Sequence, residues 1–522
     1  MRKPSQILGA LAALQVLGGC AAPGTPPARA PEPVAESPAP APVSAPAPGW
    51  TPDAPSAAVP VPSACRAFEA HATGCSSDAP EPELLVQALE VDDPLTRDEG
   101  LAKLQACDAF GPGVVLTLRA ELAPPECADV IIGKVLPTDV EPDLADVLTA
   151  LVYGAHLNRL VISAPRLEPP FSKQQFSDFS KTVLEDWVVT QAQAVYEIAK
   201  RGSTLRGYAR GVVAVEAGIA DMRFVSVVRD VPLPEELSQD AELRDAYYAE
   251  LDMALMPWKA RGRDAALVGL KEFAAAGVLA DSRVARARAV LSDLYGGRRI
   301  DRLDGLILPA PPAVAAGTVE RLVAALPTHL VRHVLPNLDA NQPRVLALLL
   351  RKGLPRAIRA DLESRPLSAE TSFALAWGLV RFGQTYWSSV DFAAAEAVLR
   401  RTSSVPSEPA ELLRGVAFVL SAGPRDAVEM MAHGSRPIDD SSVAVLDAIA
   451  KSQGPLAAAA AFDAAYILEL WPPPGDAAFW QDLARRYAQA EPGLSDANDK
   501  ARAKELASAA RATAKALLPG RP

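Results

Sequence analysis

The sequence predicts an all-α protein, and three observations support this fold class. Residues 172–202 carry apolar side chains at steps of three and four, the period of an amphipathic helix. Alanine is abundant and aromatic residues make up only 6% of the chain, a balance that suits closely approaching helices better than sheets. Strand patterns are nearly absent, because the one β-branched run, 223–231, can equally continue a helix.

The clearest predicted helix covers residues 172–202. Ser172 with Gln175 three positions later is typical of a capping box, and Gly202 follows a basic last turn. The apolar face of this helix consists of Phe176, Phe179, Val183, Trp187, Ala194 and Ile198. Shorter patterns of the same kind predict helices at 97–109, 140–160, 205–228, 235–256, 261–276 and 282–295.

The first 19 residues have the composition of a secretory signal. Arg2 and Lys3 form a basic start, and an apolar run from Ile7 to Leu17 follows. This run is about half of the ~20 apolar residues that a helix needs to cross a bilayer. We therefore expect a cleaved leader rather than a permanent transmembrane helix.

The end of this leader, Leu17-Gly18-Gly19-Cys20, resembles the lipobox of bacterial lipoproteins. The resemblance implies that Cys20 is lipidated on its sulfur, becomes the first residue after cleavage and is acylated on its new amine. Several acyl chains together anchor a protein stably. Because Ala21 and Ala22 lack the aspartate that retains such lipoproteins at the inner membrane, we expect a lipid-anchored outer-membrane protein facing the periplasm, with the cell surface as the alternative face. An ordinary signal peptide with a chance cysteine is the other interpretation.

Residues 20–62 combine the lipidated cysteine with a linker of about one-third proline and much alanine. This composition cannot form a core, so we expect a disordered, semi-rigid tether. At ~3.1 Å per residue its reach is on the order of 130 Å.

Four further cysteines lie near the start of the folded region: Cys65, Cys75, Cys107 and Cys127. An even number in an exported protein indicates two disulfides, each contributing about 3 kcal/mol in the chain-entropy model. Three pairings are open, and the short spacing favours the sequential one, Cys65–Cys75 with Cys107–Cys127. A zinc site is the alternative, although no Cys-x2-Cys pair is present.

Two proline-rich breaks, at 164–170 and 308–317, divide the folded part. They predict a cysteine-containing helical domain at 63–165, a second helical domain at 166–307 and a third at 317–522. The net charge of −11, which becomes two units more negative when the leader is removed, argues against binding nucleic acid.

The last region resembles tetratricopeptide repeats, which predicts an α-solenoid of antiparallel helix pairs. The residues that match the repeat pattern are Leu379, Phe382, Gly383, Tyr386, Ala395 and Leu399, and near the end Trp480, Leu483, Ala484 and Tyr487. Thr402 departs from the pattern, since a small alanine is usual there. The resemblance covers 368–405 and 475–519, with looser pairs at 408–433, 440–470 and 261–295. Helical hairpins of no named family are the alternative, and these also stack into a solenoid.

Motifs for catalysis or cofactor binding are not apparent in the sequence. His329 and His333 have the spacing of two metal ligands but lack a third, so we expect neither a metal nor a cofactor. Arg298, Arg299 and Arg302 could contact a carboxylate or phosphate, although pairing with Asp301 and Asp304 is the simpler interpretation.

The sequence thus favours a non-enzymatic scaffold that binds another envelope protein or a peptide through its helical repeats. Two other functions stay open. One is a cell-wall hydrolase or transglycosylase that uses the helices as a substrate platform, and the other is a purely structural spacer in the envelope.

Overall fold

A computed structural model of the chain describes residues 60–69, 81–107, 109–111, 113–133, 140–311, 317–336, 346, 350–354, 356–401, 407–434, 441–452 and 454–518. The predicted leader, Cys20, Cys75 and nearly all of the predicted tether lie outside the described residues. The predictions for these positions therefore stay predictions.

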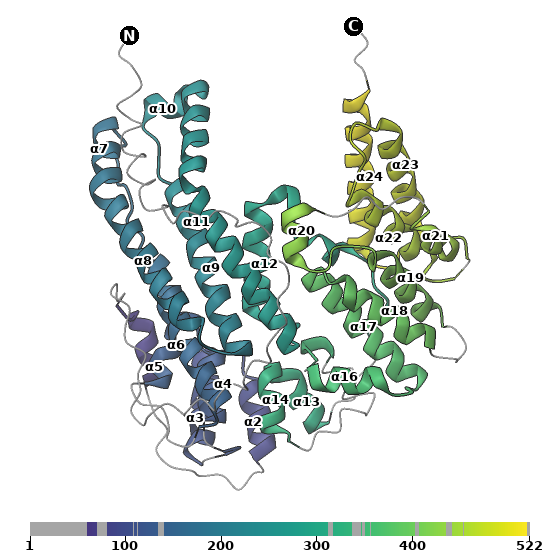
Figure 1. The fold of residues 1–522 in the computed structure, drawn as a ribbon, viewed down its shortest axis with the longest axis horizontal. Coiled ribbons are helices and arrows are strands. Elements are labelled where there is room, and N and C mark those ends of the chain that lie inside the picture. Colours follow the sequence, from purple (N-terminus) through teal and green to yellow (C-terminus); the bar gives the residue numbers. More distant parts are fainter. Residues whose placement is uncertain are drawn as a thin grey trace, which may run out of the picture. The chain divides into compact units, whose positions relative to one another are not determined.

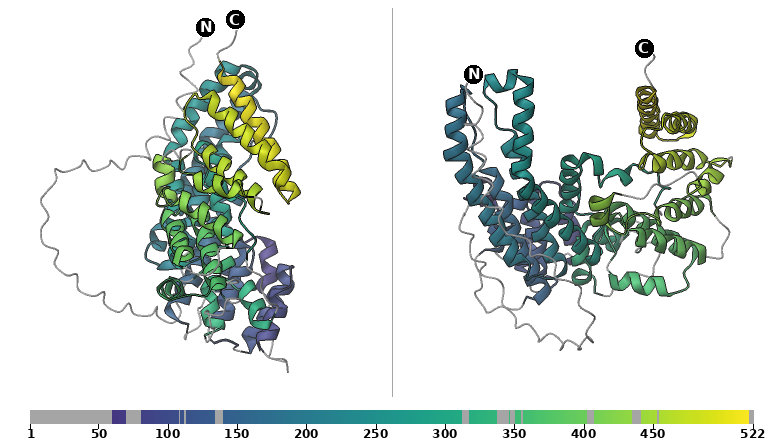
Figure 2. Two further views of the ribbon diagram at one scale, coloured as in Figure 1. Left: turned by 90° about the vertical axis from the view of Figure 1, so that its right-hand side faces the viewer. Right: turned by 45° about the horizontal axis from the view of Figure 1, so that its top comes forward.

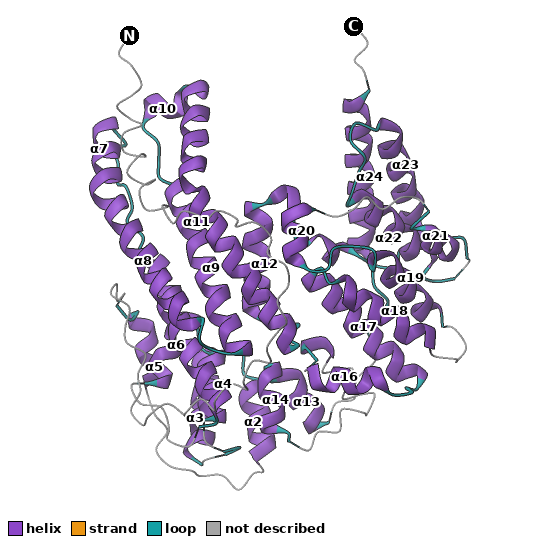
Figure 3. Cartoon of the chain, viewed as in Figure 1, coloured by secondary structure: helices purple, strands orange, loops and turns teal. Residues whose placement is uncertain are grey.

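Helices form nearly all of the regular structure, which confirms the predicted all-α class (Figure 3). Among the described residues no β-strand is present, and one isolated antiparallel bridge joins Val278 to Gly353. The run at 223–231 that resembled a strand continues a helix as far as Arg229. In the part of the chain that the structure describes, no helix combines the length and apolarity needed to span a membrane.

The chain divides into two compact units. Unit 1 comprises the described residues of Met1–Ser76 together with Asp93–Ala266, and unit 2 comprises those of Ser77–Asp92 together with Leu267–Pro522. The two proline-rich breaks at 164–170 and 308–317 lie inside unit 1 and unit 2, respectively. The division into three domains is untested by this arrangement and stays a prediction.

Unit 1 is built from helices joined by short turns (Figure 1). Its elements are η3 (Ser63–Glu69), α3 (Pro94–Ala106), α4 (Val114–Leu122), η4 (Pro125–Cys127), α5 (Ala128–Ile132), α6 (Pro142–Ile162), α7 (Lys173–Asp178), η5 (Phe179–Leu184), α8 (Glu185–Gly202), α9 (Gly207–Arg229), α10 (Glu235–Gln239) and the part of α11 (Ala241–Ala276) up to Ala266.

Helix α9 is the centre of unit 1, because α6 and α8 both pack against it and residues on all its faces are buried. It approaches α11 closely at two glycines. A Cβ on Gly218 would lie 2.6 Å from the backbone nitrogen of Ala266 and from the carbonyl oxygen of Gly262. Glycine is therefore required at Gly218 for the observed packing.

The long helix predicted at 172–202 is confirmed as the continuous run α7, η5 and α8. The Ser172 hydroxyl accepts a hydrogen bond from the backbone N–H of Gln175 at 3.3 Å, and the run ends at Gly202. Its middle turn, η5, is a π-helix. The predicted break between 256 and 261 is wrong, since α11 continues through Pro257, which lacks one backbone donor but does not end the helix.

Unit 2 is also helical, and most consecutive helices from α17 onward pack on one another. The yellow pair α23 and α24 lie side by side in both views of Figure 2. Its elements are α2 (Glu81–Leu89), the end of α11, α12 (Ser282–Leu294), η6 (Gly296–Arg298), η7 (Arg302–Gly305), α13 (Thr318–Ala325), η8 (Thr328–Leu330), α14 (Val331–Val334), α16 (Arg356–Ser364), α17 (Ala369–Tyr386), α18 (Ser389–Arg401), α19 (Glu408–Leu420), α20 (Ala427–His433), α21 (Ala444–Ala450), α22 (Ala457–Glu469), α23 (Ala477–Ala490), η9 (Glu491–Gly493) and α24 (Ala497–Leu517).

Helix α2 joins unit 2 although it precedes most of unit 1 in the sequence. It packs on α13, where Arg321 forms ion pairs with Glu83 and Glu90. The Thr318 hydroxyl donates to Glu83 at 3.1 Å. Polar contacts across more than 200 residues thus hold α2 in place.

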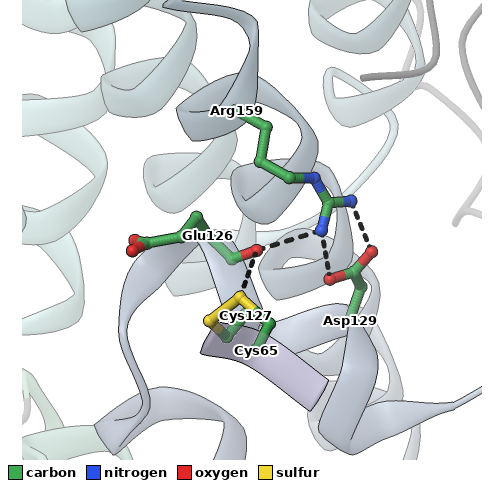
Figure 4. The surroundings of a disulfide bond; sticks show 5 residues. All are labelled: Cys65, Glu126, Cys127, Asp129 and Arg159. Atoms are coloured by element: carbon green, nitrogen blue, oxygen red, sulfur yellow. Dashed lines mark hydrogen bonds and ion pairs between the residues drawn. A yellow bond between two sulfur atoms is a disulfide. The ribbon is translucent and has the colours of Figure 1, made fainter. Parts of the chain in front are cut away.

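The cysteine pairing differs from the one favoured by the sequence. Cys65 of η3 is bonded to Cys127 of η4, with 5.1 Å between the two Cα atoms, so neither predicted sequential bridge can form (Figure 4). Cys107 is also disulfide-bonded, and its partner lies outside the described residues. The physical reason is that η3 packs on α5 and η4, which brings these two buried cysteines together across 62 positions.

Candidate functional site

The candidate site in unit 2 is formed where residues 295–309, here called the 295–309 segment, lie against helices α17 and α22. The segment connects α12 to the part of the chain before α13 and contains only the short 3-10 turns η6 and η7. Its main-chain polar groups therefore need partners from elsewhere in the fold. The two helices supply them.

Helix α17 donates three side-chain hydrogen bonds to carbonyl oxygens of the segment. The Trp387 indole N–H, at the C-cap of the helix, donates to Ile300 at 2.7 Å, and the fully buried Gln384 donates to Leu303 at 2.9 Å. The Trp377 indole N–H donates to Pro309 at 3.3 Å. These bonds recognise the backbone of the segment and not its side chains.

Helix α22 adds a donor and an acceptor. The Tyr466 hydroxyl donates to the carbonyl oxygen of Arg302 at 2.7 Å. The backbone N–H of Ile307 donates to Oδ1 of Asp463 at 2.8 Å. A Cβ on Gly305 would lie 2.3 Å from the Tyr466 hydroxyl oxygen, so glycine lets the segment approach this tyrosine closely.

Three aliphatic side chains anchor the segment. Ile300, Leu303 and Leu306 are only 0%, 1% and 7% exposed. Side chains three positions apart share one face both in a 3-10 helix and in a polyproline-like chain, and Leu306 has the backbone angles of the latter. One side of the segment is therefore apolar and faces the protein.

Charged groups hold the start of the segment. The Arg298 guanidinium donates to the carbonyl oxygens of Met431 and Ala432 in the last turn of α20, where a cation is also favoured by the helix dipole. Arg288 of α12 donates to the carbonyl oxygen of Ile300 at 3.2 Å and to Asp304 at 2.9 Å.

Local features of the sequence place the donors of α17. The Ser368 hydroxyl caps the helix by accepting from the backbone N–H of Thr371 at 3.2 Å. The helix ends at Trp387, which has a left-handed backbone with φ of 57°. Glycine is the usual residue for that conformation, which costs other residues roughly 1–2 kcal/mol. The buried indole, which packs edge-on to Trp471 and donates to Ile300, offsets this cost.

The carboxyl groups of α22 lie in a poorly solvated environment. Burial raises the pKa of Asp463 well above its ordinary value, while its hydrogen bond from Ile307 and the nearby Arg502 oppose the shift. Burial likewise raises the pKa of Glu469, opposed by the Tyr487 hydroxyl that donates to it and by the charge of Arg302. Burial therefore disfavours the ionised form of both carboxyl groups.

Replacing Asp463 by asparagine is expected to stabilise unit 2 at neutral pH. The folded pKa of Asp463 lies above the unfolded value of about 3.9, so ionisation destabilises the fold as pH rises from that value toward the folded pKa. Asparagine keeps an acceptor for Ile307 but cannot ionise. The gain over wild type should be absent near pH 3 and grow with pH, by about 1.4 kcal/mol for each unit that separates the two pKa values.

Urea unfolding of the full chain between pH 3 and pH 8, followed by hydrogen exchange of amides in α22, measures this difference. The control is Asp293→Asn, the same substitution at an exposed aspartate of α12, and it should not reproduce this gain. If Asp463→Asn destabilises the protein equally at every pH, the carboxyl group is ionised in the fold.

The residues that matched the repeat pattern lie in two helix pairs of unit 2. A Cβ on Gly383 would lie 2.7 Å from the Phe392 ring of α18, which gives a physical reason for a small residue there. The Tyr386 hydroxyl donates to the carbonyl oxygen of Val278 at 2.6 Å. Buried members of the set are Leu379, Phe382, Gly383, Tyr386, Ala395, Leu483, Ala484 and Tyr487, and half-buried members are Leu399 and Trp480.

The three arginines of the predicted cluster interact with other groups of the same chain. Arg298 caps α20, as described above, and Arg299 pairs with Asp301 at 2.7 Å. Arg302 lies half-buried with its charge acting on Glu469. His329 and His333 are both half-buried, in η8 and α14.

The side chains that bind the segment were not among the residues predicted from the sequence. Gln384 and Asp463 were the detectable ones, since each is a polar residue within an otherwise apolar helix face. The three-residue spacing of Ile300, Leu303 and Leu306 inside an arginine-rich loop was also readable. Which helix they contact was not.

The fold and the site thus define an all-helical protein in which helices bind the main chain of a segment of the same protein. No protein-family model matches the chain, and no solved structure matches it. The chain is similar to a protein pelota homolog of Thermococcus gammatolerans, with 25% identity over 227 residues, which is 40% of this chain. The match spans 58% of the length of that relative. This similarity does not assign the chain to a family.

Proposed function

We propose that the protein is an outer-membrane lipoprotein, anchored through Cys20 and facing the periplasm, whose helices form a non-catalytic scaffold of the tetratricopeptide-like solenoid type. It binds another envelope protein or a peptide. The observation that carries this proposal is that α17 and α22 hold a stretch of polypeptide that is not α-helical by side-chain bonds to its main chain. Helical repeats form extended concave surfaces that bind other chains.

The lipobox at residues 17–20 and the proline-rich tether support the proposed location. A folded part carried on a long tether can reach partners at a distance from the membrane. The consecutive packing of α17, α18 and α19, and of α21 to α24, supports a stack of helix pairs.

Chemical crosslinking in intact cells, followed by capture from membranes, tests the proposal. Wild-type protein should sediment with membranes and yield a reproducible envelope partner, whereas Cys20→Ala should lose membrane attachment. In the repeats, Gly383→Val inserts a side chain against Phe392 and should abolish partner capture. Gly154→Ala, where a Cβ meets only ordinary contacts at 3.7 Å, is the matched control and should retain it.

The rival function as a cell-wall hydrolase gives the opposite outcome. Purified protein would then cleave peptidoglycan, and Glu469→Gln would abolish cleavage because Glu469 is a carboxyl group with a raised pKa. Cleavage of this kind would overturn the scaffold proposal. Capture that is unchanged by Gly383→Val would also contradict it, because the partner would then bind outside the repeats.

A further inference from the structure

We infer that the 295–309 segment is a resident occupant of the scaffold's own peptide site, and that a partner peptide that is not α-helical and has aliphatic side chains at every third position displaces it. The inference rests on the proposed function and deepens it by naming the site, the chemistry of the ligand and the internal competitor.

Four of the contacts that hold the segment are made to its main chain. Gln384, Trp387 and Tyr466 donate to carbonyl oxygens, and Asp463 accepts from a backbone N–H. Every peptide carries these main-chain groups. The site also selects the buried aliphatic anchors, Ile300, Leu303 and Leu306, and leaves no room for a side chain at Gly305. A foreign peptide with that spacing and a glycine before the third anchor can make the same main-chain contacts.

Leaving the site empty would be energetically unfavourable. Gln384 and Asp463 are fully buried, and Trp387 nearly so. Departure of the segment would leave their polar groups without partners, which is unfavourable for buried groups. Exchange of one peptide for another keeps these groups bonded. The site therefore favours replacement of the segment over simple opening.

The segment has little structure of its own. It contains only η6 and η7, of three and four residues, and short 3-10 turns have poor hydrogen-bond geometry. At its start, Gly296 and Gly297 are exposed, and a Cβ on either would meet open space. The backbone at these glycines can move without displacing neighbouring atoms, so the segment can detach from the helices by local unfolding.

The test uses full-length lipoprotein in detergent and a fluorescent peptide of residues 298–309, with a second peptide carrying serine in place of Ile300, Leu303 and Leu306. Leu303→Ala weakens the resident segment and leaves the helices intact. It should bind the first peptide at least about 10-fold more tightly than wild type, because a larger fraction of the protein offers a free site. The serine peptide should not bind.

Three further variants distinguish an effect on peptide binding at the site from a general loss of stability. Leu412→Ala trims a buried leucine of α19, a helix that is not part of the candidate site. This variant should bind the peptide as weakly as wild type. Arg298→Ala releases the start of the segment from α20 without a core cavity and should tighten binding about 3-fold. Tyr466→Phe, added to Leu303→Ala, should weaken binding about 3- to 10-fold by removing one hydrogen bond.

Equal peptide affinity in wild type, Leu303→Ala and Arg298→Ala overturns the inference, as does tighter binding by Leu412→Ala. Crosslinking distinguishes this failure from failure of the scaffold function. If wild type captures an envelope partner and neither Leu303→Ala nor excess peptide changes the yield, the scaffold stands and the inference fails. Increased capture by Leu303→Ala that excess peptide suppresses supports both.

Discussion

Replacing Cys65 and Cys127 together with alanine is expected to lower the free energy of unfolding of unit 1 by about 4 kcal/mol. The bridge closes a loop of 62 positions, and the chain-entropy model gives that magnitude for a loop of this length. Hydrogen exchange of amides in α6 measures the loss, because α6 packs on α5 and η4 beside the bridge.

The surroundings of this bridge show why its loss should reach α6 (Figure 4). Arg159 of α6 donates to the carbonyl oxygen of Glu126 at 3.0 Å and to Asp129 at 2.8 Å. Cys127 lies between these two partners in the sequence, so the disulfide and the arginine hold the same turn. Burial opposes ionisation of Asp129, but hydrogen bonds from His156 and Arg159 lower its pKa overall.

Ile131→Val in α5 is the control for the disulfide variant. It trims a buried side chain of the helix that directly follows Cys127 without cutting a crosslink, and it should cost only about 0.5–1.5 kcal/mol. Substitution is preferable to a reductant, since a reductant would also act on the disulfide of Cys107. A loss for the double alanine variant no larger than that of Ile131→Val would contradict the prediction.

The helices were the predictable part of this fold because their determinants are local. The cap at Ser172, the apolar steps that follow and the glycine that ends the helix all lie within residues 172–202, and the structure has the expected continuous run. The break predicted near Pro257 failed for a physical reason. Proline removes a single donor, and α11 remains packed against α9 at Gly262 on the far side of it.

The cysteine pairing and the placement of α2 were not predictable, since both depend on contacts distant in sequence. Glu83 of α2 and Glu90 just after it meet Arg321 more than 200 positions later, and nothing near α2 indicates that partner. The candidate site also depends on contacts distant in sequence. The spacing of its anchors can be recognised in the sequence, but Gln384 and Asp463 are 81 and 156 positions from the backbone groups they bind.

A second large effect is expected from Asp98→Ala in α3, which should lower the free energy of unfolding of unit 1 by about 3–5 kcal/mol. Asp98 accepts two hydrogen bonds from Arg119 of α4, at 2.7 and 2.8 Å, and the two side chains are 7% and 2% exposed. Removing the carboxylate leaves a buried guanidinium without its counter-charge. Gln105, which accepts from Arg119 at 2.7 Å, offers only a neutral acceptor.

The double variant Asp98→Leu with Arg119→Met separates the cost of an unpaired charge from the worth of the pair itself. If desolvation consumes most of the attraction, as is usual for buried ion pairs, the double variant should recover nearly all of the lost stability. Asp146→Ala is the control at a more exposed ion pair, because Arg206, which pairs with Asp146 at 3.1 Å, is 62% exposed. Its removal should cost less than about 1 kcal/mol. A double variant as unstable as Asp98→Ala would mean that the ion pair itself stabilises the contact between α3 and α4.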